Sequence, residues 1–311
     1  MGNDKGTGEN YRTMVTRLFG LPCSVGGADS TLLAGDHRYS DLTVEAPERD
    51  APADPGDRVG QTTVFTWPDL GTFTVRNGHE ITTDLSENTD PTYIRNVLVG
   101  ISFGELLRQR GYLVFHGSVV DMNGEAIALV GNKHAGKSTS AAALLTQGHE
   151  FLSDDIVAVR FDGDTLMVVP GFPVFKFDPD AFDDSRLPAE PASNPDTGHG
   201  KQYYELDGEF DWDPRLLSRI CLLDPDANGF RSKTLEGHEA VMAVIEHSWP
   251  VRLRNAPYVD HDRSTIEGPD LERYARLVEH CLVQRISLEH DHSTLEELGR
   301  DLESILGTET A

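Results

Sequence analysis

The chain has 311 residues and a formal net charge of −25, from 52 acidic and 27 basic side chains. So acidic a surface repels nucleic-acid phosphates and anionic lipids, which argues against nonspecific binding to DNA, RNA or a membrane. The length allows one large domain or two smaller ones. Lysine is scarce, and this scarcity together with the large negative charge favours a protein adapted to concentrated salt, as in a halophile.

The sequence also indicates a cytoplasmic protein. The three cysteines show no C-x-x-C spacing, which is typical of a reducing compartment without a disulfide framework. No apolar run approaches the roughly 18 residues that a transmembrane helix needs, and the first residues lack an apolar signal region. We therefore expect neither a membrane segment nor a secretion signal.

Residues 1–90 are expected to form a small, mainly β region. Alternating, β-branched and aromatic residues predict strands over 42–44, 62–67, 71–76 and 79–84. The turn dipeptide Asn77-Gly78 joins the last two strands as a hairpin. Residues 45–58 hold three prolines and many charges, which predicts a loop.

Residues 91–311 are expected to form a second region of mixed α and β structure. Helical spacing runs from 92 to 110 and ends at Gly111. Residues 183–201 are rich in Pro, Asp, Ser and Gly without periodicity, which predicts a mobile lid or a disordered loop. The spacing of Ser293 and Glu296 predicts a capping box for the last helix. Further strands are expected over 112–120, with a kink, and over 125–130, 156–161, 165–169, 174–177, 216–223 and 283–288. Further helices are expected over 139–147, 239–249 and 270–282.

The most informative motif runs from residue 131 to 138 and fits the phosphate-binding pattern G-x-x-x-x-G-K-[ST]. It lies between an apolar segment of strand length and a run of good helix formers, where its mechanism requires it. Main-chain N–H groups of such a loop surround an anion, and the helix dipole adds positive potential. Lys137 is predicted to reach the β- and γ-phosphates, and the Ser138 hydroxyl to hold Mg²⁺. The predicted nucleotide-binding residues are Gly131, Asn132, Lys133, His134, Ala135, Gly136, Lys137, Ser138 and Thr139.

Other residues are candidates for chemistry. Asp154 and Asp155 end a short apolar segment beyond the loop helix, where they are either turn acids or a metal and base pair. A cation between two such acids removes their repulsion. His116 ends an apolar strand and is either a core histidine or a site residue. Lys176 and Lys201 are each either an exposed surface lysine or a residue of the site. His290-Asp291-His292 resembles a metal cluster, but successive residues of a strand face opposite sides.

The run from His116 to Asp155 resembles the catalytic domain of the HPr kinase/phosphorylase family. The matching elements are His116-Gly117-Ser118, the phosphate loop, and the segment 148–155 with its two acids. The overall layout is similar to HPr-kinase-like proteins encoded beside lasso-peptide genes, which also carry the equivalents of Arg110-Gly111 and Pro170-Gly171-Phe172-Pro173.

The resemblance implies an α/β P-loop core with a mixed sheet, similar to the nucleotide-binding part of phosphoenolpyruvate carboxykinase. It implies transfer of the ATP γ-phosphate to a serine hydroxyl of a protein, peptide or small molecule, with Mg²⁺ as cofactor, and a homo-oligomer. One acid holds Mg²⁺ and the other accepts the hydroxyl proton, with Asp154 favoured for the metal and Asp155 for the base. His116 lies near the phosphates, where it steadies the γ-phosphate or tunes an acid.

Two departures from the family pattern matter. Lys133 and His134 stand where the family loop has Ser and Gly, so His134 must adopt a backbone geometry open to a residue with a side chain. The Gly-rich motif that follows this core in bifunctional members has no counterpart, which weighs against phosphorylase activity and against HPr as the substrate. The alternatives to a kinase are an ATP-binding regulatory module and a simple NTP hydrolase.

Overall fold

The computed structural model describes residues 61–86, 89, 91–196, 200–225, 231–265, 268–288 and 293–307. Before residue 61 it describes only four short strands, β1 (Arg17–Leu18), β2 (Leu21–Pro22), β3 (Ser24–Gly26) and β4 (Thr43–Glu45). The loop predicted after β4 and the sequence His290-Asp291-His292 lie outside the described residues.

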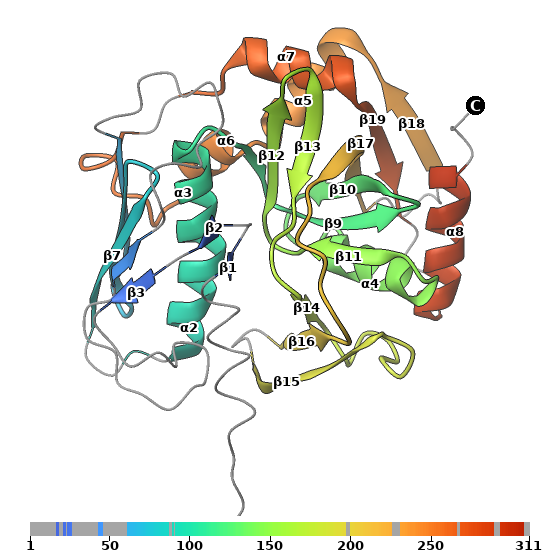
Figure 1. Cartoon of the computed structure of the whole chain (residues 1–311), viewed down its shortest axis with the longest axis horizontal. Coiled ribbons are helices and arrows are strands. Elements are labelled where there is room, and N and C mark those ends of the chain that lie inside the picture. The colour runs from blue at the N-terminus through green and yellow to red at the C-terminus, as the bar shows by residue number, and fades with distance from the viewer. Residues whose placement is uncertain are drawn as a thin grey trace, which may run out of the picture.

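A nine-stranded mixed sheet forms the centre of the molecule (Figure 1). Its main path runs β11-β9-β10-β17-β13-β12-β8, and β19 pairs with both β17 and β18. The three neighbours β10, β17 and β19 are parallel to one another, so their carboxyl ends share one edge of the sheet. The strands are β8 (Leu113–Phe115), β9 (Gly117–Met122), β10 (Glu125–Gly131), β11 (Glu150–Ser153), β12 (Val157–Asp162), β13 (Thr165–Val169), β17 (Arg215–Asp224), β18 (Arg231–Leu235) and β19 (Leu282–Ser287).

Helices cover both faces of this sheet (Figure 1). On one face, α4 (Lys137–Thr146) and α8 (Leu295–Gly307) bury leucines and alanines against the strands. On the other face, α5 (Gly237–Glu246) and α7 (Leu271–His280) enclose a second apolar cluster. Burial of one large apolar side chain stabilises a fold by about 1.5–3 kcal/mol. The result is the mixed α/β fold that the sequence indicates.

Two smaller sheets flank the central one. The first has the order β3-β4-β7-β6-β5 and contains the predicted hairpin, with β5 (Thr62–Trp67), β6 (Gly71–Arg76) and β7 (Glu80–Leu85). The second has the order β14-β16-β15, with β14 (Val174–Phe177), β15 (Ala189–Asp196) and β16 (Gln202–Leu206). The described part of the chain contains no helix that is long and apolar enough to cross a membrane.

The helix expected over 92–110 forms, but its middle is wider than an α-helix. It consists of α2 (Pro91–Arg95), the π-helix η2 (Asn96–Ser102) and α3 (Phe103–Gln109). The Phe103 N–H reaches the Leu98 carbonyl five residues back. The apolar spacing of the sequence is α-helical and gives no sign of this wider turn, which buries Val97, Leu98 and Ser102. Such π segments often occur near functional sites.

Three other expectations need correction. The strand predicted over 112–120 is two strands, β8 and β9, which meet at His116 and pair with different neighbours. The helix predicted over 239–249 is two helices, α5 and α6 (Trp249–Arg254), which are separated at Ser248. The last helix is capped one residue later than expected, because Glu297 donates its N–H to the Thr294 hydroxyl.

The segment 183–201, expected to be a lid or a disordered loop, contains a strand instead. β15 pairs antiparallel with β16, and the segment buries Leu187, Ala189 and Ala192. β15 lies at the edge of its sheet, the position at which strands tolerate proline. The prolines of this strand therefore made its sequence resemble a loop.

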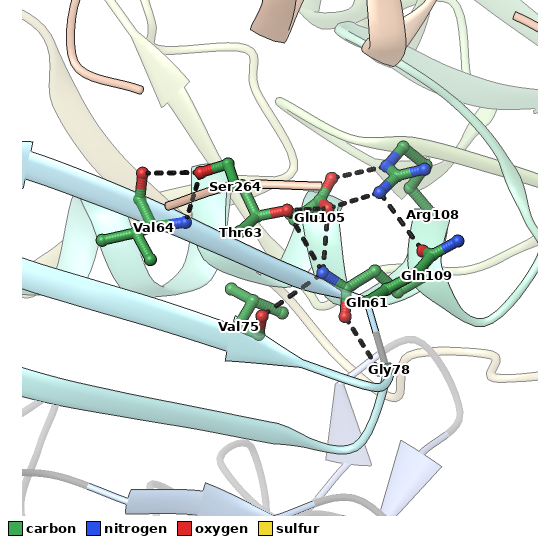
Figure 2. A network of polar contacts seen from close by, with 9 residues as sticks. All are labelled: Gln61, Thr63, Val64, Val75, Gly78, Glu105, Arg108, Gln109 and Ser264. Atoms are coloured by element: carbon green, nitrogen blue, oxygen red, sulfur yellow. Dashed lines mark hydrogen bonds and ion pairs between the residues drawn. The ribbon is translucent and has the colours of Figure 1, made fainter. Parts of the chain in front are cut away.

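A buried polar network connects the flanking β5–β7 sheet to α3 (Figure 2). Glu105, with no exposed surface, accepts two hydrogen bonds from the Arg108 guanidinium at 2.7 Å each. It also accepts one from the Thr63 hydroxyl at 2.6 Å and one from the Gln109 amide at 3.0 Å. Gln109 in turn accepts from the Gly78 N–H in the hairpin turn. The carboxylate is thus the acceptor that holds strand β5 and the helix together.

Replacing Glu105 with glutamine is expected to lower the free energy of unfolding by about 2–3 kcal/mol. The amide removes the negative charge beside the buried Arg108 and turns an N–H donor toward other donors. Urea denaturation of both proteins measures the difference. Glu80→Gln is the matched control, because the Arg76–Glu80 pair is 44% and 30% exposed and such pairs contribute up to about 1 kcal/mol. Equal losses in both variants would contradict the buried charge pairing.

Candidate active site

The phosphate-loop sequence forms the turn between β10 and α4. Gly131 ends the strand, and a Cβ added there would lie 2.8 Å from the Leu223 carbonyl oxygen of the neighbouring strand β17. Gly136 takes φ +83 as the residue before the helix, and Lys137 is the first helical residue. The loop therefore lies at the carboxyl edge of the parallel strands, where ligands of α/β proteins bind. Helix α4 directs its positive end at the same place.

His134 adopts the left-handed conformation that its place in the loop demands. Its φ is +67 and its side chain is exposed. A residue other than glycine pays roughly 1–2 kcal/mol for this conformation. The histidine at this position is thus accommodated with backbone strain at one residue.

The Lys137 side chain folds back over the loop. It is 7% exposed, and its Nζ donates to the Asn132 carbonyl oxygen at 2.8 Å. Burial lowers the pKa of Lys137 to about 8, although the charges of Asp154 and Asp155 act against this shift. At pH 7 the side chain is still an ammonium group. A compact positive charge is therefore fixed inside the loop.

Asp154 connects the loop helix to the strands beside it. Its Oδ1 accepts from the Ser118 hydroxyl at 2.6 Å and from the Ser138 hydroxyl at 3.1 Å. Its Oδ2 accepts the main-chain N–H of Lys176 at 3.0 Å. Burial, and then the charge of Asp155, raise the pKa of this carboxyl above its usual range. A cation beside Asp154 would offset both effects.

Asp155 points to different partners. Its Oδ2 lies 2.5 Å from the Lys176 Nζ, with side-chain exposures of 29% and 21%. Burial by itself would raise the pKa of Asp155, but the Lys176 ammonium and other nearby cations outweigh it and hold the pKa well below its usual range. The two neighbouring acids therefore differ in their partners and in the direction of their pKa shifts, as is common where carboxylates have separate roles.

His116 lies between β8 and β9 and reaches the same acid. Its Nδ1 is 2.9 Å from the main-chain oxygen of Asp155. Burial, followed by the charges of Arg252 and Lys137, lowers the pKa of the imidazole to about 3. The ring is therefore neutral at physiological pH.

Additional cations surround these residues. The charge of Lys201 acts on both Lys137 and Asp155, and that of Arg252, on α6, acts on both His116 and Lys137. Lys133, Lys137, Lys176 and Lys201 are four of only six lysines in a chain of net charge −25. Positive charge is thus concentrated around the phosphate loop, which suits a ligand with several phosphate groups.

The aromatic ring of Tyr203 lies next to the Lys176 ammonium group. The Nζ of Lys176 lies 5.4 Å from the centre of the Tyr203 ring, and the Arg95 guanidinium stacks 3.6 Å from that centre. The Tyr203 hydroxyl donates to Asn96, the first residue of η2. Neither Arg95 nor Tyr203 carries a signal in the sequence, because both join the site only through the fold.

The arrangement fits magnesium in the manner of phosphate loops. Within the described ranges, no three His, Cys, Asp or Glu side chains come together as a metal cage. Mg²⁺ does not need one, since it is commonly held by one or two carboxylates together with substrate phosphates. Ser138 and Asp154 offer two oxygens that already contact each other at the helix N-terminus. These are the residues that would hold the ion.

The structure brings together the residues that the sequence singles out. The loop, the acid pair and His116 come from segments up to 39 residues apart and lie in one connected set of hydrogen bonds. Lys176 and Lys201, ambiguous in the sequence, lie in the same place. Arg252 escaped sequence reasoning because it depends on a distant contact: Ser248, just before α6, pairs with Phe115, the residue before His116.

Comparisons with known proteins agree on one family over part of the chain. The HPr kinase/phosphorylase of Prosthecochloris aestuarii is 29% identical over 104 residues, which are 33% of this chain and 29% of that protein. The HPr kinase/phosphorylase of Chlorobium luteolum is 39% identical over 57 residues, which are 18% of this chain and 17% of that protein. The chain therefore spans less than a third of the length of these curated relatives. No family model matches the chain.

A solved structure, the Hpr(Ser) kinase/phosphatase from Coxiella burnetii, aligns with 62% of this chain and 98% of its own. The identity is 11% and the TM-score 0.27. A likeness this weak adds nothing to the sequence matches.

Proposed function

We propose that the chain, which is similar to HPr kinase/phosphorylases over part of its length, is an ATP-dependent kinase that transfers the γ-phosphate to a serine hydroxyl. The acceptor is a serine-bearing protein, peptide or small molecule. The observation that supports this proposal is the contact between Ser138 and Asp154. It joins the first turn of the loop helix to an acid pair, as phosphoryl transfer with a bound metal requires.

The proposed roles follow from the contacts of each group. The loop N–H groups and the Lys137 ammonium bind the phosphates of ATP and compensate charge on the β and γ oxygens. Ser138 and Asp154 would hold Mg²⁺, and the bound ion would neutralise phosphate charge. Asp155, whose carboxylate contacts Lys176, orients the acceptor hydroxyl and takes its proton as the oxygen bonds to phosphorus. The bond from the γ-phosphorus to the bridging oxygen breaks, and ADP leaves.

The acid pair favours a kinase over a module that only binds ATP. A module that only binds ATP needs the loop and the metal site. It does not need a second carboxylate such as that of Asp155, which contacts Lys176. A simple hydrolase would use the same groups with water as acceptor. Adaptation to concentrated salt, a cytoplasmic location, a homo-oligomer and the boundary near residue 90 stay predictions.

Labelled ATP and a lysate of the source organism test the proposed activity. The account predicts label on serine of a protein, peptide or small molecule, with ADP formed in equal amount. Free labelled phosphate without labelled serine would indicate a hydrolase. ATP that is bound but unconsumed would indicate a regulatory module, and either result would overturn the kinase proposal.

A further inference from the structure

His116 makes its closest polar contact with the main chain. Its Nδ1 lies 2.9 Å from the carbonyl oxygen of Asp155. A carbonyl oxygen only accepts hydrogen bonds, so Nδ1 must carry the hydrogen and donate it. In the neutral ring this leaves Nε2 without a hydrogen. The ring therefore has no second N–H with which to donate to a phosphate oxygen.

The carbonyl that His116 contacts belongs to a strained residue. Asp155 has φ +65, a left-handed conformation that few residues other than glycine adopt and that Asp and Asn tolerate best. The same carbonyl also accepts from the Gly117 N–H at 3.4 Å. Strained conformations of this kind persist where surrounding contacts hold them. Here both contacts come from His116 and Gly117, at the junction of β8 and β9.

The left-handed turn at Asp155 separates the two acids. Asp154 accepts hydrogen bonds from Ser118 and Ser138, whereas the Asp155 carboxylate meets Lys176 at 2.5 Å. The chain direction at Asp155 thus decides which groups its carboxylate faces. A change in this one main-chain conformation would move the carboxylate away from the place where the proposed transfer needs it.

We propose that His116 is a positioning residue that acts through the main chain. Its Nδ1–H holds Asp155 in the left-handed conformation and so aims the Asp155 carboxylate. The inference rests on the proposed function only because one of its two readouts is phosphoryl transfer. The other readout is the main-chain conformation of Asp155. It assigns no contact between His116 and the phosphates.

Three substitutions separate this role from a direct one. The side-chain nitrogen of asparagine is as many bonds from Cα as Nδ1 of histidine, whereas that of glutamine lies nearer the position of Nε2. His116→Asn is expected to keep kcat within about threefold of wild type. His116→Ala and His116→Gln are expected to lose about 10- to 100-fold, because small misplacements of reacting groups have effects of this size. The KM for MgATP should stay unchanged in all three.

The opposite pattern would overturn the proposal. Activity retained in His116→Gln and lost in His116→Asn would mean that the ring acts through Nε2. A rise in KM that equals the fall in kcat/KM would mean that the ring binds the nucleotide. If His116→Ala does not fold, the comparison of the Asn and Gln variants carries the test.

Crystal structures provide a readout that does not depend on catalysis. Asp155 is expected to keep its left-handed conformation in His116→Asn and to leave it in His116→Gln and His116→Ala. A wild-type protein without transfer activity would end the proposed function, yet this readout would still apply. Asp155 unchanged at φ near +65 in the Ala and Gln variants would show that His116 does not hold it.

Discussion

Replacing Lys137 with alanine is expected to reduce ATP turnover about a thousandfold or more and to weaken MgATP binding severely. The side chain is almost fully buried in the loop and lies within reach of the charges of Asp154 and Asp155. Helix α4, Lys137–Thr146, contains no other lysine. Removal of one preorganised group that stabilises the transition-state charge typically lowers kcat by about 10²–10³, and loss of ground-state binding adds to this.

Calorimetric titration with MgATP and a coupled ADP assay measure both effects. Lys233→Ala is the matched control, because it removes the same charge from a residue on β18 that pairs with Glu239. The control should bind and turn over ATP as the wild type does. Equal turnover in Lys137→Ala and the wild type would show that the loop lysine does not act on the phosphates.

Asp155→Asn is expected to abolish transfer, by about a thousandfold or more, while MgATP affinity stays within about threefold. Asparagine has the same shape and also tolerates the left-handed conformation at φ +65, so the backbone should not change. The amide cannot accept the proton of an attacking hydroxyl. Single-turnover transfer from labelled ATP, with a binding titration beside it, separates the two effects.

Asp154→Asn should give the complementary result. Asp154 contacts Ser138, so its variant is expected to lose the magnesium dependence of ATP binding before any chemical step. Normal transfer by Asp155→Asn would remove Asp155 from the role of base. Identical defects in both variants would mean that the acids act as one unit and that their separate roles are wrong.

The phosphate loop and its surroundings were readable in the sequence because the motif is local. Gly131, Gly136 and Lys137 have roles that depend on a turn of fixed length, and the flanking strand and helix have the expected periodicity. The strands of the hairpin around Asn77-Gly78 were equally clear, since both turn residues take positive φ as such a turn requires. The α/β class of the core follows from the same local signals.

The remaining features depend on contacts between distant segments. Lys176 looked like an ordinary lysine, and only the approach of β14 to β11 places its ammonium on Asp155. Arg252 joins the site from α6, more than a hundred residues beyond the loop. The strand β15 was hidden by its prolines, which an edge position tolerates. The apolar residues of this segment have α-helical spacing in the sequence, so they gave no sign of the π-helix that begins at Asn96.

The most direct test of the account is the magnesium dependence of ATP binding by the wild-type protein. Calorimetry should be performed with excess Mg²⁺ and with a chelator, at low and at molar KCl, because screening reduces the repulsion between ATP and a chain of charge −25. The account predicts saturable binding in Mg²⁺ that weakens at least about tenfold in the chelator. Absence of binding at both salt concentrations, or equal affinity with and without Mg²⁺, would contradict it.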